Sequence, residues 1–379
     1  MNKKIIHIIS RMNVGGPSKI INYYMEHLHE YNYDSILICG RPSAEEGEIK
    51  PILLPSIQII YLDGLSPGSS FWQSFKSFIS LIKIVRKLKP NVIHSHQAKA
   101  GVFARISGFL LRTPKIIHTY HGHVFYGYFS PLKTKIIIFI EKFLNFLSHQ
   151  SIAISPEIFY DITTKYKICN PRKTVLINVG IDTQIFLSLP SPQASKKNFG
   201  IPSGKFTIGF IGRLVNIKNP LGFVALAKEL IKTNKNLHFV ITGDGSLKDT
   251  VVRKIKDENL EEFFTILPWA NEVQQVLVCL DLLVMTSINE GTPLILMEAM
   301  AIGIPVASTA VGGIPYLIEH EKTGFTISQD TTLQAEYLNK LLNNYEIQTA
   351  LIKSAAKEKI LKNFALEVLL KQTVELYNK

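Results

Sequence analysis

The chain has 379 residues, of which 46% are hydrophobic, and its formal net charge is +12 at pH 7. This length favours two domains over a single core. No apolar run approaches the roughly 18 residues of a membrane-spanning helix, and the stretch before Arg11 is too short for a signal peptide. We therefore expect a cytoplasmic protein. Cys39, Cys169 and Cys279 match no metal or redox spacing, so we expect buried, reduced thiols.

The basic excess lies entirely in the first half of the chain. Residues 1–180 contain 22 basic and 10 acidic side chains, whereas residues 181–379 contain 20 of each. A domain with such an excess suggests a nucleic acid, an anionic membrane or a phosphorylated acceptor as its partner. A basic surface that serves only solubility is the alternative.

Short runs rich in Ile and Val alternate with longer helical patterns through the first half. Continuous apolar strands of this kind are typical of a parallel sheet covered by helices on both faces. The expected strands are 3–10, 34–39, 57–62, 91–96, 115–119, 151–155 and 174–178.

A second alternation follows a stretch rich in Ser, Pro and Gly at 188–205, which reads as a linker. The sequence thus predicts two doubly wound α/β domains, 1–182 and 183–361, with ligands at the carboxyl ends of the strands and a cleft between the domains. The last helix, about 362–379, is expected to return to the first domain. The expected strands of the second half are 206–212, 237–243, 263–267, 281–287, 305–309 and 324–328.

Two glutamates flank the apolar stretch "EGTPLILME" at 290–298. Thr292 is a good N-cap and Pro293 suits the first helical position, so we expect a helix from about 293. Glu290 then precedes the helix, Glu298 lies inside it, and the free amides of the first turn form an anion site between them. A nucleotide sugar fits this arrangement. A solvated Glu290 and a Glu298 paired with a lysine are the alternative.

The segment "FIGRLVNIKNP" at 210–220 places Arg213 and Lys218 in the loop after a strand that ends near Gly212. Two cations at a strand end can hold a diphosphate and stabilise it as a leaving group. Ordinary surface charges remain the alternative for both.

Glycine pairs and histidines mark other strand ends. Gly15 and Gly16 follow the first strand, but neither G-x-G-x-x-G nor a Walker lysine is present, which weakens a dinucleotide or ATP interpretation. Histidines cluster at 94–96 and 118–129, where one of them can donate a hydrogen bond to a sugar hydroxyl. Metal binding is the competing interpretation, although no carboxylate is interleaved with these histidines.

Five segments, taken in order, are "GG" near the amino end, "GRLVNIKN", "TGDGSL", "EGTPLILMEAMAIGIPVAST" and "VGGIP". Together they resemble the retaining family 4 glycosyltransferases of bacterial polysaccharide and lipopolysaccharide synthesis, and the resemblance covers nearly the whole chain. The resemblance implies the GT-B fold, with two Rossmann-like domains. It implies a donor site in which Glu298 binds the ribose, Glu290 the donor sugar, and Arg213 with Lys218 the diphosphate. His121 would contact the sugar, and the glycine loop at Gly15 and Gly16 would lie beside the phosphates. The donor site would be completed by the main chain of Gly291, Thr292, Pro293 and Leu294, and by main-chain groups around Leu267 to Ala270, including Trp269, that read the base.

Two residues depart from the family pattern. Tyr316 stands where many relatives have an acidic residue, and Trp269 where a smaller residue is usual. The sequence contains no Asp-x-Asp, so neither a metal nor another cofactor is expected, and the two cations with the helix amides would stabilise the diphosphate. Retention of configuration by a front-face mechanism is adopted from the resemblance.

The expected activity is transfer of a hexose or N-acetylhexosamine, from a donor that is UDP-linked, to a glycan or a lipid-diphosphate-linked acceptor. A sugar-nucleotide epimerase of the same fold and a non-catalytic basic protein that binds nucleic acid or membrane are the alternatives, and no nucleic-acid motif is present. Lys76, Lys83 and Lys87 share a helical face beside aromatic residues. They suggest peripheral attachment to the inner face of an anionic membrane.

Overall fold

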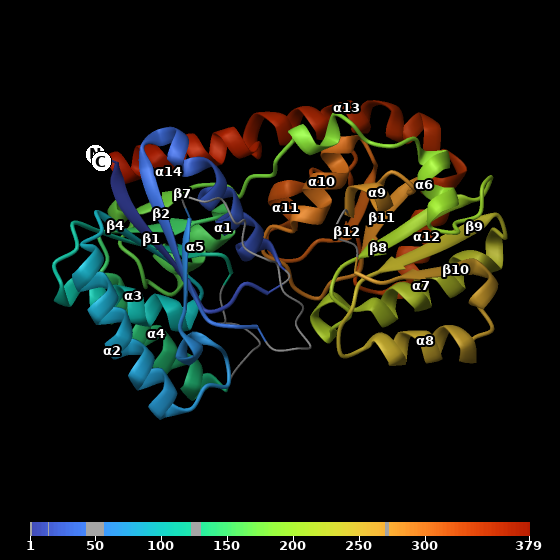
Figure 1. Cartoon of the computed structure of the whole chain (residues 1–379). Helices are drawn as coiled ribbons and strands as arrows, with labels where there is room; N and C mark the ends of the chain where they lie inside the picture. Colours follow the sequence, from blue (N-terminus) through green and yellow to red (C-terminus); the bar gives the residue numbers. More distant parts are fainter. Residues whose placement is uncertain (1, 14, 43–56, 123–129, 270–272) are drawn as a thin grey trace. The chain divides into compact units, whose positions relative to one another are not determined.

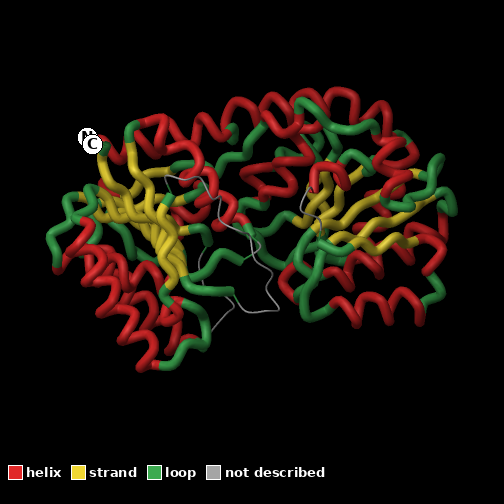
Figure 2. The backbone as a smooth tube through the Cα atoms, viewed as in Figure 1, coloured by secondary structure: helices red, strands yellow, loops and turns green. Residues whose placement is uncertain are grey.

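The computed structural model describes residues 2–13, 15–42, 57–122, 130–269 and 273–379. The chain forms two compact units, one of Met1–Gly180 with Leu366–Lys379 and the other of Ile181–Ala365. In each unit a central sheet lies between layers of helices (Figure 2). These divisions lie within four residues of the predicted ones at 182 and 362.

Unit 1 contains a parallel sheet of seven strands in the order β3-β2-β1-β4-β5-β6-β7. Each strand begins within one residue and ends within two residues of a predicted run, because a strand covered on both faces is mostly apolar. Central strands β1 and β4 pair directly, with His7 opposite His94. The strands are β1 (Lys3–Ile9), β2 (Tyr33–Cys39), β3 (Gln58–Tyr61), β4 (Val92–His96), β5 (Lys115–Tyr120), β6 (Gln150–Ala153) and β7 (Thr174–Leu176).

The helices of unit 1 include the last helix of the chain. Lys3 donates a hydrogen bond of 2.9 Å to Asn378, which fixes the two ends of the chain beside each other (Figure 1). Tyr24 and Thr373 join the first and last helices through a bond of 3.1 Å. The expected return of the last helix is therefore confirmed. The helices are α1 (Gly16–His27), α2 (Phe71–Leu88), α3 (Ala98–Leu110), α4 (Pro131–Phe146), α5 (Pro156–Tyr160) and α14 (Leu366–Asn378).

Unit 2 has a parallel sheet of six strands in the order β10-β9-β8-β11-β12-β13, again at the predicted positions. The strand order reverses between β8 and β11, so the loops that follow these two strands diverge from the same point. The strands are β8 (Phe206–Ile211), β9 (Leu237–Thr242), β10 (Phe264–Leu267), β11 (Leu282–Met285), β12 (Val306–Thr309) and β13 (Phe325–Ile327).

Helices cover the sheet of unit 2 and bury a core that includes Phe210, Phe223 and Phe239. The predicted linker at 188–205 contains a short helix, α6, which Ser191 caps by accepting a hydrogen bond from the amide of Ala194. The helices are α6 (Pro192–Asn198), α7 (Pro220–Thr233), α8 (Lys248–Asp257), α9 (Val273–Leu277), α10 (Leu294–Ile302), α11 (Ile314–Leu317), α12 (Thr331–Asn343) and α13 (Tyr345–Asn363).

Three smaller predictions can be compared with the structure. Cys39, Cys169 and Cys279 are buried and form no disulfide within the described part of the chain, as expected. The single helix predicted from 362 is wrong at its start, because α13 ends at Asn363 and α14 begins at Leu366. In the described residues no helix is both long enough and apolar enough to cross a bilayer.

Candidate active site

The point where the strand order of unit 2 reverses brings together the loops after β8 and β11. The amide of Ile288 donates to the carbonyl of Ile217 over 2.9 Å, and the Thr286 hydroxyl donates to the carbonyl of Asn219 over 2.8 Å. In open parallel sheets, ligands bind outside the carboxyl ends of the strands at such a point. The two bonds therefore tie together the two loops from which a ligand site is built.

Lys218 and Glu290 form an ion pair at this point. The Lys218 ammonium lies 2.5 and 2.7 Å from the two carboxylate oxygens, and the Ser287 hydroxyl donates to one of these oxygens over 2.7 Å. The Glu290 side chain is only 6% exposed and that of Lys218 is 20% exposed. The sequence assigned these residues to different parts of one ligand, whereas here each is the other's partner.

The glycine pair after β12 supports the backbone of Glu290. The amide of Gly313 donates to the carbonyl of Glu290 over 3.1 Å. Gly312 has a φ of 53°, and a β-carbon there would lie 1.7 Å from that same carbonyl oxygen. Only glycine satisfies both the backbone conformation and this close approach. The "VGGIP" segment therefore holds the backbone of the loop after β11 that carries Glu290.

Helix α10 begins at Leu294 with Pro293 as its N-cap, and no side chain caps it. The expectation that Thr292 caps a helix starting at 293 is wrong by one residue. The Thr292 hydroxyl is buried and has no hydrogen-bond partner among the residues that the structure describes. The free amides of the first turn and this hydroxyl are the kind of groups that an anion or a sugar satisfies. Gly291 lies between Thr292 and the ion-paired Glu290. Glu298 is 4% exposed within α10.

Arg213 lies in the loop after β8, as predicted, and is partly buried. Among the residues that the structure describes, its guanidinium has no hydrogen bond or ion pair. The loop is held by the "TGDGSL" segment, because the amide of Leu214 donates to the carbonyl of Asp244 over 2.8 Å. A β-carbon at Gly243 would lie 1.9 Å from the carbonyl oxygen of Gly212. This tight contact fixes the backbone that carries Arg213.

Trp269 follows β10 and is half-buried. It therefore lies at the same carboxyl edge of the sheet as the other residues of unit 2. Ala270, the last residue of the segment expected to read the base, lies outside the described residues.

The corresponding edge of unit 1 carries Gly15, Gly16 and His121. Gly15 is the N-cap of α1 and Gly16 its first residue, with no side-chain cap on the helix. The φ of Gly15, 165°, is an extended value open to any residue. His121 follows β5, and its Nε2 lies 2.9 Å from Nδ1 of His96. Burial lowers the pKa of His121 to about 4, so this side chain is neutral at pH 7.

Sequence reasoning did not identify several residues of these two edges. Ser287 bonds Glu290, and Thr309 fixes the carbonyl of Ser287 through a bond of 2.6 Å, but isolated hydroxyl residues give no signal in a sequence. His7 was treated as part of an apolar strand, yet it meets His96 in the core. The contact between His7 and His96 follows from the pairing of β1 with β4, which the sequence does not show.

Two family sequence models divide the chain between them. The model described as "Glycosyltransferase Family 4" matches residues 14–185, and the model described as "Glycosyl transferases group 1" matches residues 192–358. The two matches correspond closely to the two units of the structure.

Comparison with curated proteins and solved structures gives relatives over the full length. The chain is 29% identical to the Escherichia coli protein "UDP-Gal:alpha-D-GlcNAc-diphosphoundecaprenol alpha-1,3-galactosyltransferase" over 86% of this chain and 84% of that protein. It is 22% identical to "Capsular polysaccharide biosynthesis glycosyltransferase CapM" of Staphylococcus aureus, over 100% and 97%. Its fold matches the crystal structure of Anabaena Alr3699/HepE in complex with UDP and glucose, with a TM-score of 0.82, 19% identity and 100% coverage of both chains.

Proposed function

Because this chain belongs to the family 4 glycosyltransferases and has their GT-B fold, we propose that it transfers a hexose or N-acetylhexosamine from a UDP-sugar to a lipid-diphosphate-linked or glycan acceptor in surface polysaccharide synthesis. The observation that carries this proposal is the Lys218–Glu290 ion pair at the strand-order reversal of unit 2. Its carboxylate, its ammonium and the uncapped start of α10 supply the groups that a sugar diphosphate needs.

The diphosphate is assigned to Arg213, Lys218 and the first-turn amides of α10. Arg213 has no protein partner in the described residues, so its donors remain available for a phosphate. A nucleoside diphosphate that leaves gains negative charge, and fixed cations and amides stabilise that charge without reorganising. These groups make a metal unnecessary, so we propose transfer that does not depend on a divalent ion.

The sugar and the ribose are assigned to the two glutamates. Glu290 is held by Lys218 and Ser287, so its carboxylate is oriented before the donor arrives. A sugar hydroxyl can donate to the Glu290 oxygen while Lys218 turns toward the diphosphate. Glu298 is assigned to the ribose and Trp269 to the base. Transfer with retention of configuration by a front-face mechanism follows from the family assignment.

Two relatives support the identity of the substrates. The name of the Escherichia coli relative specifies UDP-galactose and a diphosphoundecaprenol acceptor, and the Anabaena structure contains UDP and glucose. A lipid diphosphate also fits the basic first half of this chain. We therefore assign the acceptor to unit 1 and the donor to unit 2.

The experiment that tests the function is a transfer assay with the purified protein. UDP-galactose, UDP-glucose and their N-acetylated forms are offered with an N-acetylhexosaminyl diphospholipid, in excess EDTA and in magnesium. We expect one donor to give an α-linked product at the same rate in both conditions. Conversion of a donor without acceptor would indicate an epimerase, and activity lost in EDTA and restored by magnesium would overturn the metal-independent mechanism.

Unit 1 also presents an apolar surface with basic surroundings, which we assign to the cytoplasmic face of the membrane. Phe71 and Trp72 on α2 are 75% and 69% exposed, and Phe139 on α4 is 74% exposed. Helix α3 lies between these two helices, and Figure 1 shows α2, α3 and α4 on the same side of unit 1. Phe78 of α2 packs against Phe103 instead of contributing to this surface.

Exposed lysines lie on the same two helices as these aromatic residues. Lys76, Lys83 and Lys87 are exposed on α2, as are Lys133, Lys135 and Lys142 on α4. Each cation near an anionic bilayer contributes about 1 kcal/mol, so five or six are enough for reversible attachment. Inserted aromatic rings would add apolar burial to this attraction.

Sedimentation with vesicles tests the attachment. The protein should sediment with vesicles of anionic lipid at low salt, dissociate as salt rises, and lose binding when Lys76, Lys83 and Lys87 are changed to Glu. The matched control changes three exposed lysines of unit 2, Lys256, Lys357 and Lys362, to Glu and should still bind. Equal binding to neutral vesicles, or equal loss in both variants, would contradict an electrostatic docking surface on unit 1.

A further inference from the structure

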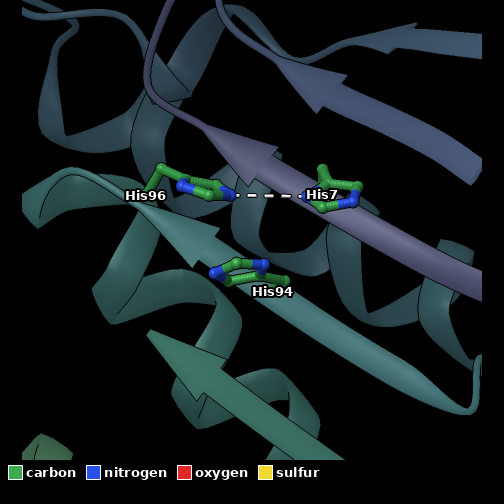
Figure 3. Close-up of side chains that lie close together, drawn as sticks. All are labelled: His7, His94 and His96. Carbon is green, nitrogen blue, oxygen red and sulfur yellow. Dashed lines mark hydrogen bonds between the residues drawn. The ribbon is translucent and has the colours of Figure 1, made fainter. Parts of the chain in front are cut away.

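Three imidazoles form a connected chain from the interior of unit 1 to the residue at its edge. His121 Nε2 lies 2.9 Å from His96 Nδ1, and His96 Nε2 lies 3.4 Å from His7 Nδ1. Figure 3 shows the inner part of this chain, with a dashed line between His96 and His7 and with His94 below them. His7 and His96 are completely buried. Among the described residues, the other nitrogen of His7, Nε2, is buried and has no hydrogen-bond partner.

Packing holds the inner members of the chain in place. The ring of Tyr24 stacks on His7 with ring centres 5.2 Å apart and an angle of 15° between the planes. The ring of His94 lies 4.2 Å from that of His96. His94 itself is bonded at both nitrogens, to Tyr377 over 2.6 Å and to Thr119 over 2.7 Å. The final helix, α14, thus contacts the group of histidines through Tyr377.

A metal ion is the other explanation for this cluster, because ligand atoms of His7, His94 and His96 lie within 4.8 Å of one another. Two nitrogens on a tetrahedral zinc ion are about 3.3 Å apart, which is also compatible with the distance between His7 and His96. However, both nitrogens of His94 already have hydrogen-bond partners. In the described residues no fourth His, Cys, Asp or Glu joins the group. The hydrogen-bonded chain therefore explains the geometry better.

A neutral imidazole has one N–H donor and one lone pair, so the chain can be satisfied in only two directions. In one direction His7 donates to His96 and His96 donates to His121, and the unpartnered atom of His7 is a lone pair. In the other direction every bond is reversed, and the unpartnered atom is a buried N–H. Buried N–H groups without an acceptor are rarer in native proteins than acceptors without a full set of donors. The first direction is therefore favoured.

We propose that His96, backed by His7, is a positioning residue that fixes His121 as the tautomer with its hydrogen on Nδ1. The Nε2 lone pair of His121 then accepts from His96, and Nδ1–H is the group left for a ligand. His121 thus acts as a hydrogen-bond donor toward a sugar oxygen and cannot accept a proton through Nε2. The low pKa of His121 keeps the imidazole neutral, as this arrangement requires.

The tautomer can be measured without any substrate, by long-range ¹H–¹⁵N correlation spectra of the protein labelled in its histidines. We expect His7, His96 and His121 of the wild-type protein to carry hydrogen on Nδ1. A hydrogen on Nε2 of His121 would overturn the proposal. A stoichiometric metal ion that is lost on changing His7 to Phe would overturn it as well.

Variants of His96 separate positioning from simple packing. His96→Leu removes the donor to His121, so the His121 tautomer should change or become mixed. His96→Asn places an amide donor near the former Nδ1 and should restore the wild-type tautomer. His238→Gln is the matched control, because His238 is a buried histidine of unit 2 with a pKa of about 4. An unchanged His121 tautomer in His96→Leu would contradict the proposal.

The consequence for catalysis rests on the proposed function. His96→Leu should lower kcat for transfer about tenfold, the effect of weakening one hydrogen bond in the transition state, with UDP binding unchanged. His96→Asn should recover most of that loss. If the tautomers are as expected but no sugar is transferred, the proposed function fails and the positioning of His121 stands. If transfer occurs while His121 carries its hydrogen on Nε2, the positioning alone fails.

Discussion

The two units place their charged groups differently. In unit 1 the ion pair of Arg105 with Glu141 lies between helices α3 and α4, is almost completely buried, and is joined by Tyr120, whose hydroxyl donates to Glu141 over 2.9 Å. The carboxyl edge of the central strands in unit 1 carries neutral imidazoles instead. In unit 2 the pair of Lys218 with Glu290 stands at the carboxyl edge itself.

The hydrogen bonds of the two pairs explain the difference. Arg105 donates two bonds to Glu141 and a third to the carbonyl of Gly101, so the guanidinium has partners on every side. Lys218 has Glu290 as its partner, and its side chain stays partly exposed. A saturated pair inside a unit has no donor left for a ligand and is part of the packing. A pair with an unused donor at a strand-order reversal is suited to a ligand. The following predictions test this distinction.

The largest expected effect is acid unfolding of unit 1. Burial lowers the pKa of His7 to about 3 and that of His121 to about 4, and it holds the pKa values of His94, His96 and His118 well below 6.5. Below pH 6.5 the histidines of the unfolded chain bind protons, whereas those of the folded unit stay neutral. The free energy of unfolding of unit 1 is therefore highest above pH 6.5 and decreases as the pH falls toward 4.

Unit 2 has one comparable histidine, His238, so it should resist acid longer. Hydrogen exchange of the two units between pH 7 and pH 4 measures this directly. Loss of protection in both units at the same pH would contradict the difference.

The next effect is the loss of the structural pair. Glu141→Ala leaves the Arg105 guanidinium buried without its partner, which typically costs 3–5 kcal/mol, so the free energy of unfolding of unit 1 should fall by about that amount. Urea unfolding measures the change. The double variant Arg105→Leu with Glu141→Leu should be far more stable than Glu141→Ala. A loss below about 1 kcal/mol in Glu141→Ala would show that the pair is not structural.

Lys218→Met tests the pair of unit 2. Loss of one electrostatic stabiliser of the leaving diphosphate should reduce kcat about 100-fold or more, as for other preorganised transition-state donors. The fold should survive, because Glu290 keeps its bond from Ser287 and lies at the edge of the sheet. Near-normal turnover would remove Lys218 from the mechanism, and unfolding would make the pair a structural one like that of unit 1.

Arg213→Ala should have the smallest of these effects, about tenfold weaker binding of UDP, which corresponds to about 1.4 kcal/mol for one lost charge-assisted contact. Calorimetric titration of UDP gives the affinity. Arg253→Ala, which removes an exposed arginine of α8 in the same unit, is the matched control and should not change it. Equal affinity in wild type and Arg213→Ala would assign the diphosphate to other groups.

The fold was predictable because its signal is local. A strand buried on both faces is mostly apolar, so the thirteen strands of the described residues coincide with Ile- and Val-rich runs in the sequence. For the site residues, the sequence predicted that each one lies at the end of a strand, but it did not predict which of them are in contact. The contact between Lys218 and Glu290, 72 positions apart, depends on the adjacency of β8 and β11, which no local pattern encodes.

Glu141 is a residue whose burial could not be predicted from the sequence. In the sequence, Glu141 and Lys142 look alike, as charges that end the apolar run at 136–140. In the structure Glu141 is buried against Arg105 and Lys142 is exposed. The difference arises from which face of α4 meets α3, and the mixed apolar pattern of α4 does not define that face. The exposed aromatic residues of α4 have the same origin.

The central claim is that the carboxylate of Glu290 binds the sugar of a nucleotide sugar while Lys218 and Arg213 bind its diphosphate. The most direct measurement is calorimetric binding of UDP and of the UDP-sugar donor to the wild-type protein and to Glu290→Gln. The substitution should weaken binding of the UDP-sugar by at least about tenfold and leave the affinity for UDP within about twofold, because hydrogen bonds to a charged group contribute roughly 1.5–3 kcal/mol. An equal change for both ligands, or no change for either, would contradict it.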